Sequence, residues 1–210
     1  GQIEKEEYYK NEKKTGIWTS YNKGGLKDGK WATYFDNGQL EKEEHYKDGK
    51  EDGKWVWYYE NGQISKKITF LNRERSGKWI SYYENGQIKG EENYIDGKLV
   101  GKMISYYENG QMWKTRNLKD GKLDGKITTY YNNGQMWEER NFKDGNEYGE
   151  WTSYFENGQI KKERHIKFGK LNGKMASYYE NGQTKKEGNY INGKKDGKWT
   201  SYYEDGQIKE

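Results

Sequence analysis

Short runs in which apolar and polar residues alternate are separated along the whole chain by turn-forming dipeptides. A representative unit has an alternating run at Trp31–Phe35, the dipeptide Asn37-Gly38, and a second run at Gln39–Tyr46. Alternation with a period of two predicts half-buried β-strands, and Asn-Gly between two such runs predicts a hairpin with a type I′ turn, in which both central residues have positive φ. A further turn at Lys47–Gly53 leads into the next strand. No apolar period of 3.6 residues is sustained, so the sequence predicts an antiparallel meander without helices.

These units repeat with a fixed period along the chain. The turn glycine recurs at a constant spacing as Gly38, Gly62, Gly86, Gly110, Gly134, Gly158, Gly182 and Gly206. Self-similarity at a fixed period of this size indicates a repeat array. We therefore expect residues 1–210 to form a single array of about eight hairpins. One repeat near residues 18–30 is shortened, because Trp18 and Trp31 are closer together in the sequence than equivalent positions of successive repeats, and Gly1–Ile3 fits the half-repeat after a turn glycine.

Pairing across a two-residue loop assigns the side chains to two faces of the sheet. Tyr34 then lies opposite Glu41, and residues 33 and 31 lie opposite residues 42 and 44. Side chains alternate between faces along a strand. One face, the packing face, carries Trp31, Thr33, Phe35, Leu40 and Tyr46 with their equivalents in the other repeats. The opposite ladder face carries one tyrosine per hairpin, namely Tyr34, Tyr58, Tyr82, Tyr106, Tyr130, Tyr154, Tyr178 and Tyr202.

The composition fits such a sheet better than it fits a thick globular core. Leu, Ile, Val and Phe account for only 27 of 210 residues, whereas 9 Trp, 21 Tyr and 5 Phe supply 35 aromatic rings. Each aromatic side chain can bury roughly 150–250 Å², so an ordered array of them can replace an aliphatic core. We therefore predict an all-β protein, an elongated solenoid of tandem 24-residue antiparallel hairpins that form a single twisted sheet.

Charge and residue usage exclude several function classes. The 38 Lys and Arg are balanced by 34 Asp and Glu, and acids alternate with bases along the strands, so the basic stripe of a nucleic-acid binder is missing. The absence of Cys removes thiolate catalysis and thiolate metal sites. No window approaches the roughly 20 apolar residues of a membrane helix. The two histidines, His45 and His165, are five repeats apart and are not expected to share a site.

Acidic residues offer the remaining candidate chemistry, and their pattern favours a structural role. Asp48 and Asp52 have a spacing that resembles a calcium loop, but other copies of this segment lack one or both acids, and Asp-Gly is also common in turns. Neighbouring carboxylates such as Glu43 and Glu44 recur throughout, and no pocket is expected to raise the pKa of one of them above the rest. The sequence therefore predicts no catalytic, metal or cofactor site.

An irregularity in two adjacent repeats marks a candidate binding surface. Trp113 and Trp137 each lie three residues after a turn glycine, where other copies hold Glu, Ser or Lys. By the pairing above, they lie across from the ladder tyrosines of their own hairpins, and large exposed aromatic side chains are typical interface anchors. Alternatively, the two tryptophans compensate within the fold for Met103 and Ile127, which replace the packing-face Trp in these repeats. The predicted partner-binding residues are Tyr82, Tyr106, Trp113, Tyr130, Trp137 and Tyr154.

The motif Gly-Lys-Trp-x-x-Tyr-Tyr-Glu-Asn-Gly-Gln-Ile is seen best at Gly53–Ile64, Gly77–Ile88 and Gly197–Ile208. It resembles the bacterial, Asn-Gly-Gln variant of the MORN (membrane occupation and recognition nexus) repeat, and the resemblance covers nearly the whole chain. This resemblance implies stacked hairpins and a role in protein interaction or scaffolding, and some bacterial members are antitoxin or immunity partners. A weaker resemblance is to the choline-binding repeats of bacterial surface proteins, whose period is shorter than the spacing of the turn glycines in this chain.

These observations predict a non-catalytic module that binds a protein partner, either a bacterial toxin or a host or surface protein, through the ladder face. The alternative is a cell-surface glycan, because Tyr and Trp rings stack on sugars. Binding of nucleic acid or membrane lipid is not expected. The bias to Lys, Asn, Glu, Ile and Tyr is typical of a low-GC bacterium. An exported or cell-surface location is favoured over a cytoplasmic one.

Overall fold

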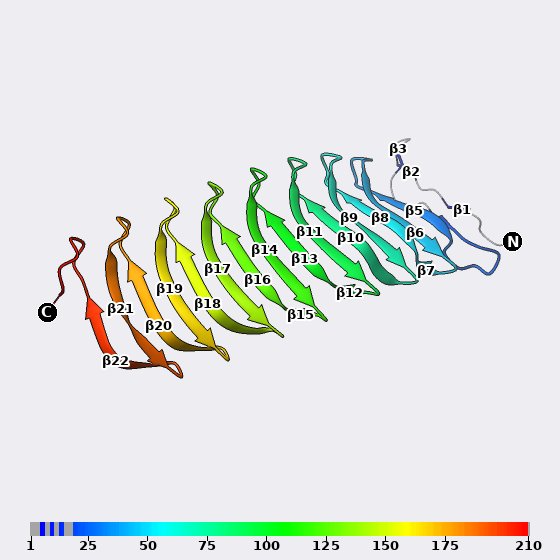
Figure 1. The fold of residues 1–210 in the computed structure, drawn as a ribbon. Coiled ribbons are helices and arrows are strands. Elements are labelled where there is room, and N and C mark those ends of the chain that lie inside the picture. Colours follow the sequence, from blue (N-terminus) through cyan, green and yellow to red (C-terminus); the bar gives the residue numbers. More distant parts are fainter. Residues whose placement is uncertain (1–4, 7–8, 11–12, 15–18, 210) are drawn as a thin grey trace. The chain divides into compact units, whose positions relative to one another are not determined.

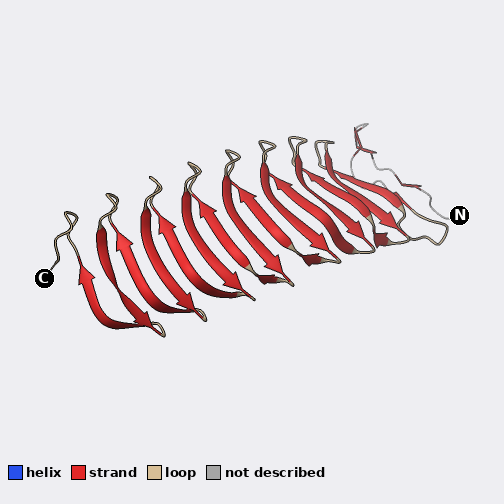
Figure 2. Cartoon of the chain, viewed as in Figure 1, coloured by secondary structure: helices blue, strands red, loops and turns tan. Residues whose placement is uncertain are grey.

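The computed structural model describes residues 5–6, 9–10, 13–14 and 19–209. In this part of the chain every regular element is a β-strand, which confirms the predicted all-β class (Figure 2). The described residues include no helix that is long and apolar enough to cross a membrane. Trp18 and Gly1–Ile3, which bear on the shortened repeat, lie outside the described residues. The chain divides into two compact units, residues 1–100 and residues 101–210.

The first unit contains two small pairings and one larger antiparallel sheet. The strand pairs are β1 (Lys5–Glu6) with β4 (Thr19–Ser20), and β2 (Tyr9–Lys10) with β3 (Lys13–Lys14). The larger sheet consists of β5 (Gly29–Tyr34), β6 (Leu40–Lys47), β7 (Lys50–Glu51), β8 (Gly53–Tyr58), β9 (Ile64–Leu71), β10 (Glu74–Tyr82), β11 (Ile88–Ile95) and β12 (Lys98–Leu99). Within this sheet each strand pairs only with strands that are close to it in the sequence (Figure 1).

The second unit is an antiparallel sheet of the same kind. Its strands are β13 (Gly101–Tyr106), β14 (Met112–Lys119), β15 (Lys122–Leu123), β16 (Gly125–Tyr130), β17 (Met136–Lys143), β18 (Asn146–Tyr154), β19 (Ile160–Lys167), β20 (Lys170–Tyr178), β21 (Thr184–Ile191) and β22 (Lys194–Ser201). Here too each hairpin pairs with the hairpins before and after it, as a tandem repeat array requires.

Away from the Asn-Gly turns, the predicted register is confirmed. Trp31 pairs with Glu44, and residue 33 pairs with residue 42. On the packing face of the first unit, aromatic rings form a continuous row in which Trp31 and Tyr46 have ring centroids 5.5 Å apart, and Tyr46 and Trp55 have centroids 5.4 Å apart. Trp31 is 5% exposed. The indole nitrogen of Trp55 also donates a 3.0 Å hydrogen bond to the backbone carbonyl of His45 in the preceding hairpin.

At the Asn-Gly turns, the predicted type I′ conformation is wrong. Only Gly38 has positive φ (85°), while Asn37 stays in the ordinary region because its side-chain oxygen accepts the backbone N–H of Gln39 at 2.8 Å. The Gly38 N–H donates to the Phe35 carbonyl, which gives a three-residue turn with glycine at its last position. As a result Leu40, and not Glu41, pairs with Tyr34, and a β-bulge restores the predicted register from residue 33 onward.

The type I′ geometry lies instead at the opposite end of each hairpin. Asp48 and Gly49 have φ of 47° and 75°, and Lys47 pairs with Lys50 directly across the two-residue loop. The equivalent turns hold Asn or Asp followed by Gly, with two exceptions that place Arg73 (φ 73°) and Phe168 (φ 51°) in the left-handed region.

Hydrogen bonds join successive hairpins at both ends. The Tyr131 hydroxyl donates to the backbone carbonyl of Tyr154 at 2.9 Å, and the Asn181 side-chain amide donates to the carbonyl of Glu204 at 3.0 Å. At the other end, the Asp124 carboxylate accepts the backbone N–H of Asp144, the first residue of the next type I′ turn, at 3.5 Å. The aspartates with calcium-loop spacing therefore link one turn to the next.

Candidate interaction surface

The ladder tyrosines are half-buried, and several of their hydroxyl groups are bound to glutamates of the preceding hairpin. Tyr178 donates to Glu163 at 2.8 Å and Tyr202 donates to Glu187 at 2.9 Å. Burial, with the hydrogen bond to Glu163 as the next cause, raises the pKa of Tyr178 to about 12. The tyrosine therefore stays protonated and acts as a structural hydrogen-bond donor across the hairpin boundary.

Lysine–glutamate pairs accompany the tyrosines on the ladder face. In the second unit Lys126 lies 2.5 Å from Glu139, and Lys174 lies 3.3 Å from Glu187. The polar side chains on the ladder face of this unit therefore largely have hydrogen-bond or ion-pair partners within the fold. Of the sequence-predicted residues, Tyr106, Tyr130 and Tyr154 lie half-buried on this face, and Tyr82 occupies the equivalent half-buried position in the first unit.

Trp113 and Trp137 do not lie across from the ladder tyrosines, so this part of the prediction is wrong. Tyr106 pairs with Met112, and the shift in register leaves Trp113 as the extra residue of the bulge. The Trp113 ring lies 6.5 Å from that of Tyr107. The physical reason is the three-residue turn, which displaces the pairing near the turn by one residue and so changes the direction of the side chain that follows.

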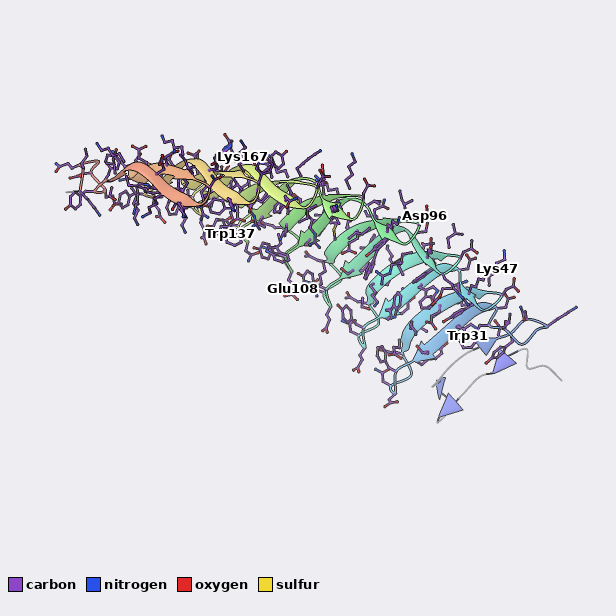
Figure 3. The ribbon with its side chains drawn as sticks, turned by 90° about the horizontal axis from the view of Figure 1, so that it is seen from below. Trp31, Lys47, Asp96, Glu108, Trp137 and Lys167 are labelled. Carbon is purple, nitrogen blue, oxygen red and sulfur yellow. The ribbon has the colours of Figure 1, made fainter. Side chains whose placement is uncertain are left out.

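The second tryptophan repeats this arrangement one hairpin later. Tyr130 pairs with Met136, and the Trp137 ring lies 6.3 Å from the ring of Tyr131. Trp137 also lines a hollow that it shares with Trp151 of the packing face. Figure 3 shows Trp137 on one side of the second unit's ribbon and Lys167 on the other.

Four large apolar side chains lie exposed at the Asn-Gly end of two adjacent hairpins of the second unit. We call them the Met–Trp patch: Met112, Trp113, Met136 and Trp137, which are 41%, 44%, 38% and 44% exposed. Sequence reasoning missed the two methionines, although the dipeptide Met-Trp recurs at the same place in two successive repeats and could have signalled them.

The patch rests on a rigid support. The Tyr107 hydroxyl binds the carbonyl of Tyr130 at 2.7 Å, and the Asn109 amide binds the side-chain oxygen of Asn132 at 2.7 Å, so the two hairpins that carry the patch are fixed to each other. In several other repeats a lysine occupies the Trp position, and its ammonium lies over the neighbouring ring, as Lys161 does over Phe155 at 5.4 Å. In the Met–Trp patch a tryptophan takes the place of this lysine, so the surface exposed there is apolar instead of charged.

The described residues contain no cluster of three His, Cys, Asp or Glu side chains able to hold a metal ion.

Fold and surface together define a protein built from tandem β-hairpin repeats. A model of the MORN repeat variant matches eight segments of the chain, residues 27–48, 51–72, 75–96, 99–120, 123–144, 147–167, 171–192 and 195–210. The chain belongs to the MORN repeat variant family. MORN repeats commonly serve as protein-interaction modules.

A comparison with curated proteins finds no match. Among solved structures, the chain is similar to one titled as the crystal structure of TcdB2-TccC3-Cdc42, with 15% identity, a TM-score of 0.24 and coverage of 91% of this chain and 13% of that one. The structure of TcdB2-TccC3 matches with 14% identity and a TM-score of 0.25 over the same shares of the two chains. The chain thus spans 13% of the length of these two chains. A porin-like protein from Bacteroides uniformis ATCC 8492 matches with 11% identity and a TM-score of 0.22, covering 93% of this chain and 92% of the other.

Proposed function

We propose that the chain is a non-catalytic module that binds a protein partner through the Met–Trp patch. The observation that supports this proposal is the exposure of four large apolar side chains on two hairpins that are fixed to each other. Exposed apolar clusters on soluble proteins mark interaction sites, and Trp is the residue most enriched among interface anchors. Met adds an adaptable apolar surface. The partner class follows the family resemblance: a bacterial toxin, or a host or surface protein.

The ladder tyrosines have a supporting part in this proposal. Tyr106 and Tyr130 pair with the two methionines of the patch, and the Tyr154 carbonyl accepts the Tyr131 hydroxyl that fixes the next hairpin. Catalysis is not favoured by these groups, because burial and glutamate neighbours raise the pKa of ladder tyrosines instead of bringing it toward neutrality.

The test compares one partner with two matched variants. Affinity purification with the chain as bait, followed by mass spectrometry, identifies the partner, and calorimetric titration measures its affinity. Trp113→Ala combined with Trp137→Ala is expected to weaken binding by about a thousand-fold, since buried aromatic anchors are worth about 2 kcal/mol or more each. Phe168→Asn removes an aromatic side chain that is 85% exposed at the opposite end of a hairpin, and it is expected to leave the affinity within two-fold.

Three results would count against the proposal. Unchanged affinity in the double variant would exclude the Met–Trp patch. If the chain binds a glycan array and the double variant does not, the ligand of the patch is a sugar and not a protein. Substrate turnover by the purified chain would contradict a non-catalytic role. Circular dichroism of each variant separates loss of binding from loss of fold.

A further inference from the structure

The positive charge of the protein is concentrated in the second unit. Residues 101–210 contain 20 Lys and Arg against 16 Asp and Glu, whereas residues 1–100 contain 18 of each. Alternation of acids and bases along the sequence conceals how these charges divide between the two faces, because neighbouring residues of a strand point to opposite sides. The expectation that no basic stripe exists is therefore wrong for one face of this unit.

Six of the cations on the packing face of the second unit occupy two equivalent register positions of successive hairpins. Arg164 pairs with Trp151, and Lys162 pairs with Ser153, which places both on the packing face. The same register positions in neighbouring hairpins complete the cationic band: Lys114, Arg116, Arg140, Lys162, Arg164 and Lys186.

Most of this charge is not neutralised by the protein. Among the described residues, Arg140 alone in the cationic band forms ion pairs within 4.0 Å, with Glu138 at 2.8 Å and Glu147 at 4.0 Å. The charges of these two glutamates also act on Arg164, and that of Glu138 acts on Lys114. The Arg164 guanidinium lies over the Trp151 ring at 3.7 Å. The ladder face, in contrast, pairs its lysines with glutamates.

The cations of the band also act on one another. Burial lowers the pKa of Lys162, and the positive charge of Arg164 lowers it further. The pKa of Lys114 is also lowered, first by burial and then by the positive charges of Arg116 and Arg140. A surface on which like charges are held together in this way attracts anions.

An open hollow of about 470 Å³ connects the cationic band to the Met–Trp patch. Trp137 and Phe155 form part of its wall, and Ser153 and Ser177 contribute hydroxyl groups. Lys161, Lys162, Arg164 and Lys185 bring positive charge beside a single carboxylate, that of Glu138. A hollow with apolar walls and a few cations suits a segment that carries both apolar and anionic side chains.

We propose that the cationic band of the second unit binds an acidic segment of a partner protein, with an apolar side chain of that segment on Trp137 and its carboxylates over Lys162, Arg164 and Lys186. The proposal rests on the proposed function, because it names the chemistry of the protein that the Met–Trp patch anchors.

Spacing supports an extended peptide that runs across the strands. Equivalent cations in successive hairpins, such as Lys162 and Lys186, are two strands apart, or ~9.6 Å at ~4.8 Å per strand. Three residues of an extended polyproline II segment span ~9.3 Å, and its three residues per turn return the side chain to the same side. Carboxylates at every third residue of a partner segment would therefore meet one cation per hairpin.

Flanking charge favours a protein over a nucleic acid. The turns beside the band expose Glu156, Glu180 and Glu204, and Glu138 lies within it. A phosphate backbone carries a charge at every nucleotide and would be repelled by these acids, whereas a peptide can place neutral residues opposite them.

Fluorescence anisotropy with defined probes tests this inference. The probes are a labelled ten-residue peptide with Glu at every third position and one Phe, the same peptide with Gln in place of Glu, and a twelve-nucleotide oligouridine. The acidic peptide is expected to bind at least ten-fold more tightly than the Gln peptide at low salt, with a difference that shrinks as salt is added.

Two charge-matched double variants locate the binding site. Lys162→Glu with Lys186→Glu is expected to weaken acidic-peptide binding at least ten-fold. Lys122→Glu with Lys170→Glu makes the same change in net charge at exposed positions of the Asp-Gly end, and it is expected to change the affinity less than two-fold. If the first variant fails to fold, Lys162→Gln with Lys186→Gln replaces it, with the same expected direction.

The inference is overturned if the Glu and Gln peptides bind equally, if both double variants lose binding equally, or if oligouridine binds more tightly than the acidic peptide. The purified partner separates this inference from the proposed function. Loss of binding in the Trp113→Ala and Trp137→Ala variant, with full binding in the Lys162→Glu and Lys186→Glu variant, would keep the patch and reject the cationic band. The reverse result would reject the patch alone.

Discussion

The hydroxyl of Tyr107 donates a 2.7 Å hydrogen bond to the backbone carbonyl of Tyr130 in the following hairpin. Tyr179 makes the same bond to Tyr202, whereas Phe155 occupies this position without a hydroxyl. We expect Tyr107→Phe to lower the free energy of unfolding by about 1 kcal/mol, because a part-buried carbonyl loses its donor. Phe155→Tyr is expected to raise it by a similar amount. Urea titrations of both variants measure this, and equal midpoints for Tyr107→Phe and the parent would show that the bond contributes nothing.

Two type I′ turns contain residues that are poorly suited to positive φ. Phe168 has φ of 51° and Arg73 has φ of 73°, where other repeats hold Asn or Asp and Gly, respectively. A side chain with a Cβ costs roughly 1–2 kcal/mol in this region, and Asn and Gly tolerate it best. Phe168→Asn and Arg73→Gly are therefore each expected to stabilise their own unit by about 1 kcal/mol. Thermal melts provide the measurement, and a lowered melting temperature in either variant would contradict the strain.

The indole of Trp199 lies directly on Gly188. A Cβ added to Gly188 would be 2.3 Å from the Trp199 ring, although the φ of Gly188 is not in the left-handed region. Gly188→Ala usually improves a strand. Here we expect the substitution to lower the free energy of unfolding by about 1–3 kcal/mol, because the Trp199 ring must move to make room for the added methyl group. The matched substitution Gly90→Ala, at a strand position in the first unit, serves as a control for the change in backbone preference. Equal stability of the two variants would show that the ring moves at no cost.

Alkaline pH is expected to destabilise the sheet through its bonded tyrosines. The pKa of Tyr58 is raised from 10.0 to about 12 by burial and then by Glu43, and that of Tyr178 is raised to about 12 in the same way. Because the folded pKa is higher than the unfolded one, the stabilisation is fully present below pH 10 and is lost as the pH rises through 12.

Chemical denaturation between pH 9 and pH 12 measures this loss, and the absorbance of tyrosinate follows the ionisation directly. Tyr178→Phe should make the decline in stability shallower while lowering stability at neutral pH. An unaltered pH profile in that variant would assign the alkaline transition to other groups.

The period and the register in the middle of the strands could be read from the sequence, because both depend on alternation. Trp31 opposite Glu44 follows from counting outward from Asn37-Gly38. The conformations of the turns at the two ends of each hairpin could not be read from it, since both Asn-Gly and Asp-Gly are compatible with a type I′ turn and with a three-residue turn. The decisive contact is the bond from the Gln39 N–H to the Asn37 side chain, which keeps Asn37 out of the left-handed region.

This turn also explains what could be predicted of the candidate surface. Trp113 and Trp137 were recognisable as irregular residues in the repeat, but their direction depended on one residue of loop length. The cationic band was hidden for a different reason. Lys162 and Glu163 are adjacent in sequence and cancel in any count along the chain, yet they point to opposite faces, and only the pairing of residue 162 with Ser153 separates them.

The bonds between hairpins have one further consequence. The hydroxyls of Tyr107 and Tyr131 each reach a carbonyl 23 residues ahead, and the turns at Asp144 and Asn192 each meet an acid or amide 20 residues behind. Where neighbouring repeats share these bonds, deleting or duplicating one whole repeat within a unit returns the donor to an acceptor of the same kind, while an insertion of half a repeat would bring unlike turns together. Copy number can change by whole steps without a new interface being invented, which lets a lineage lengthen or shorten its recognition surface by recombination between near-identical stretches of its gene.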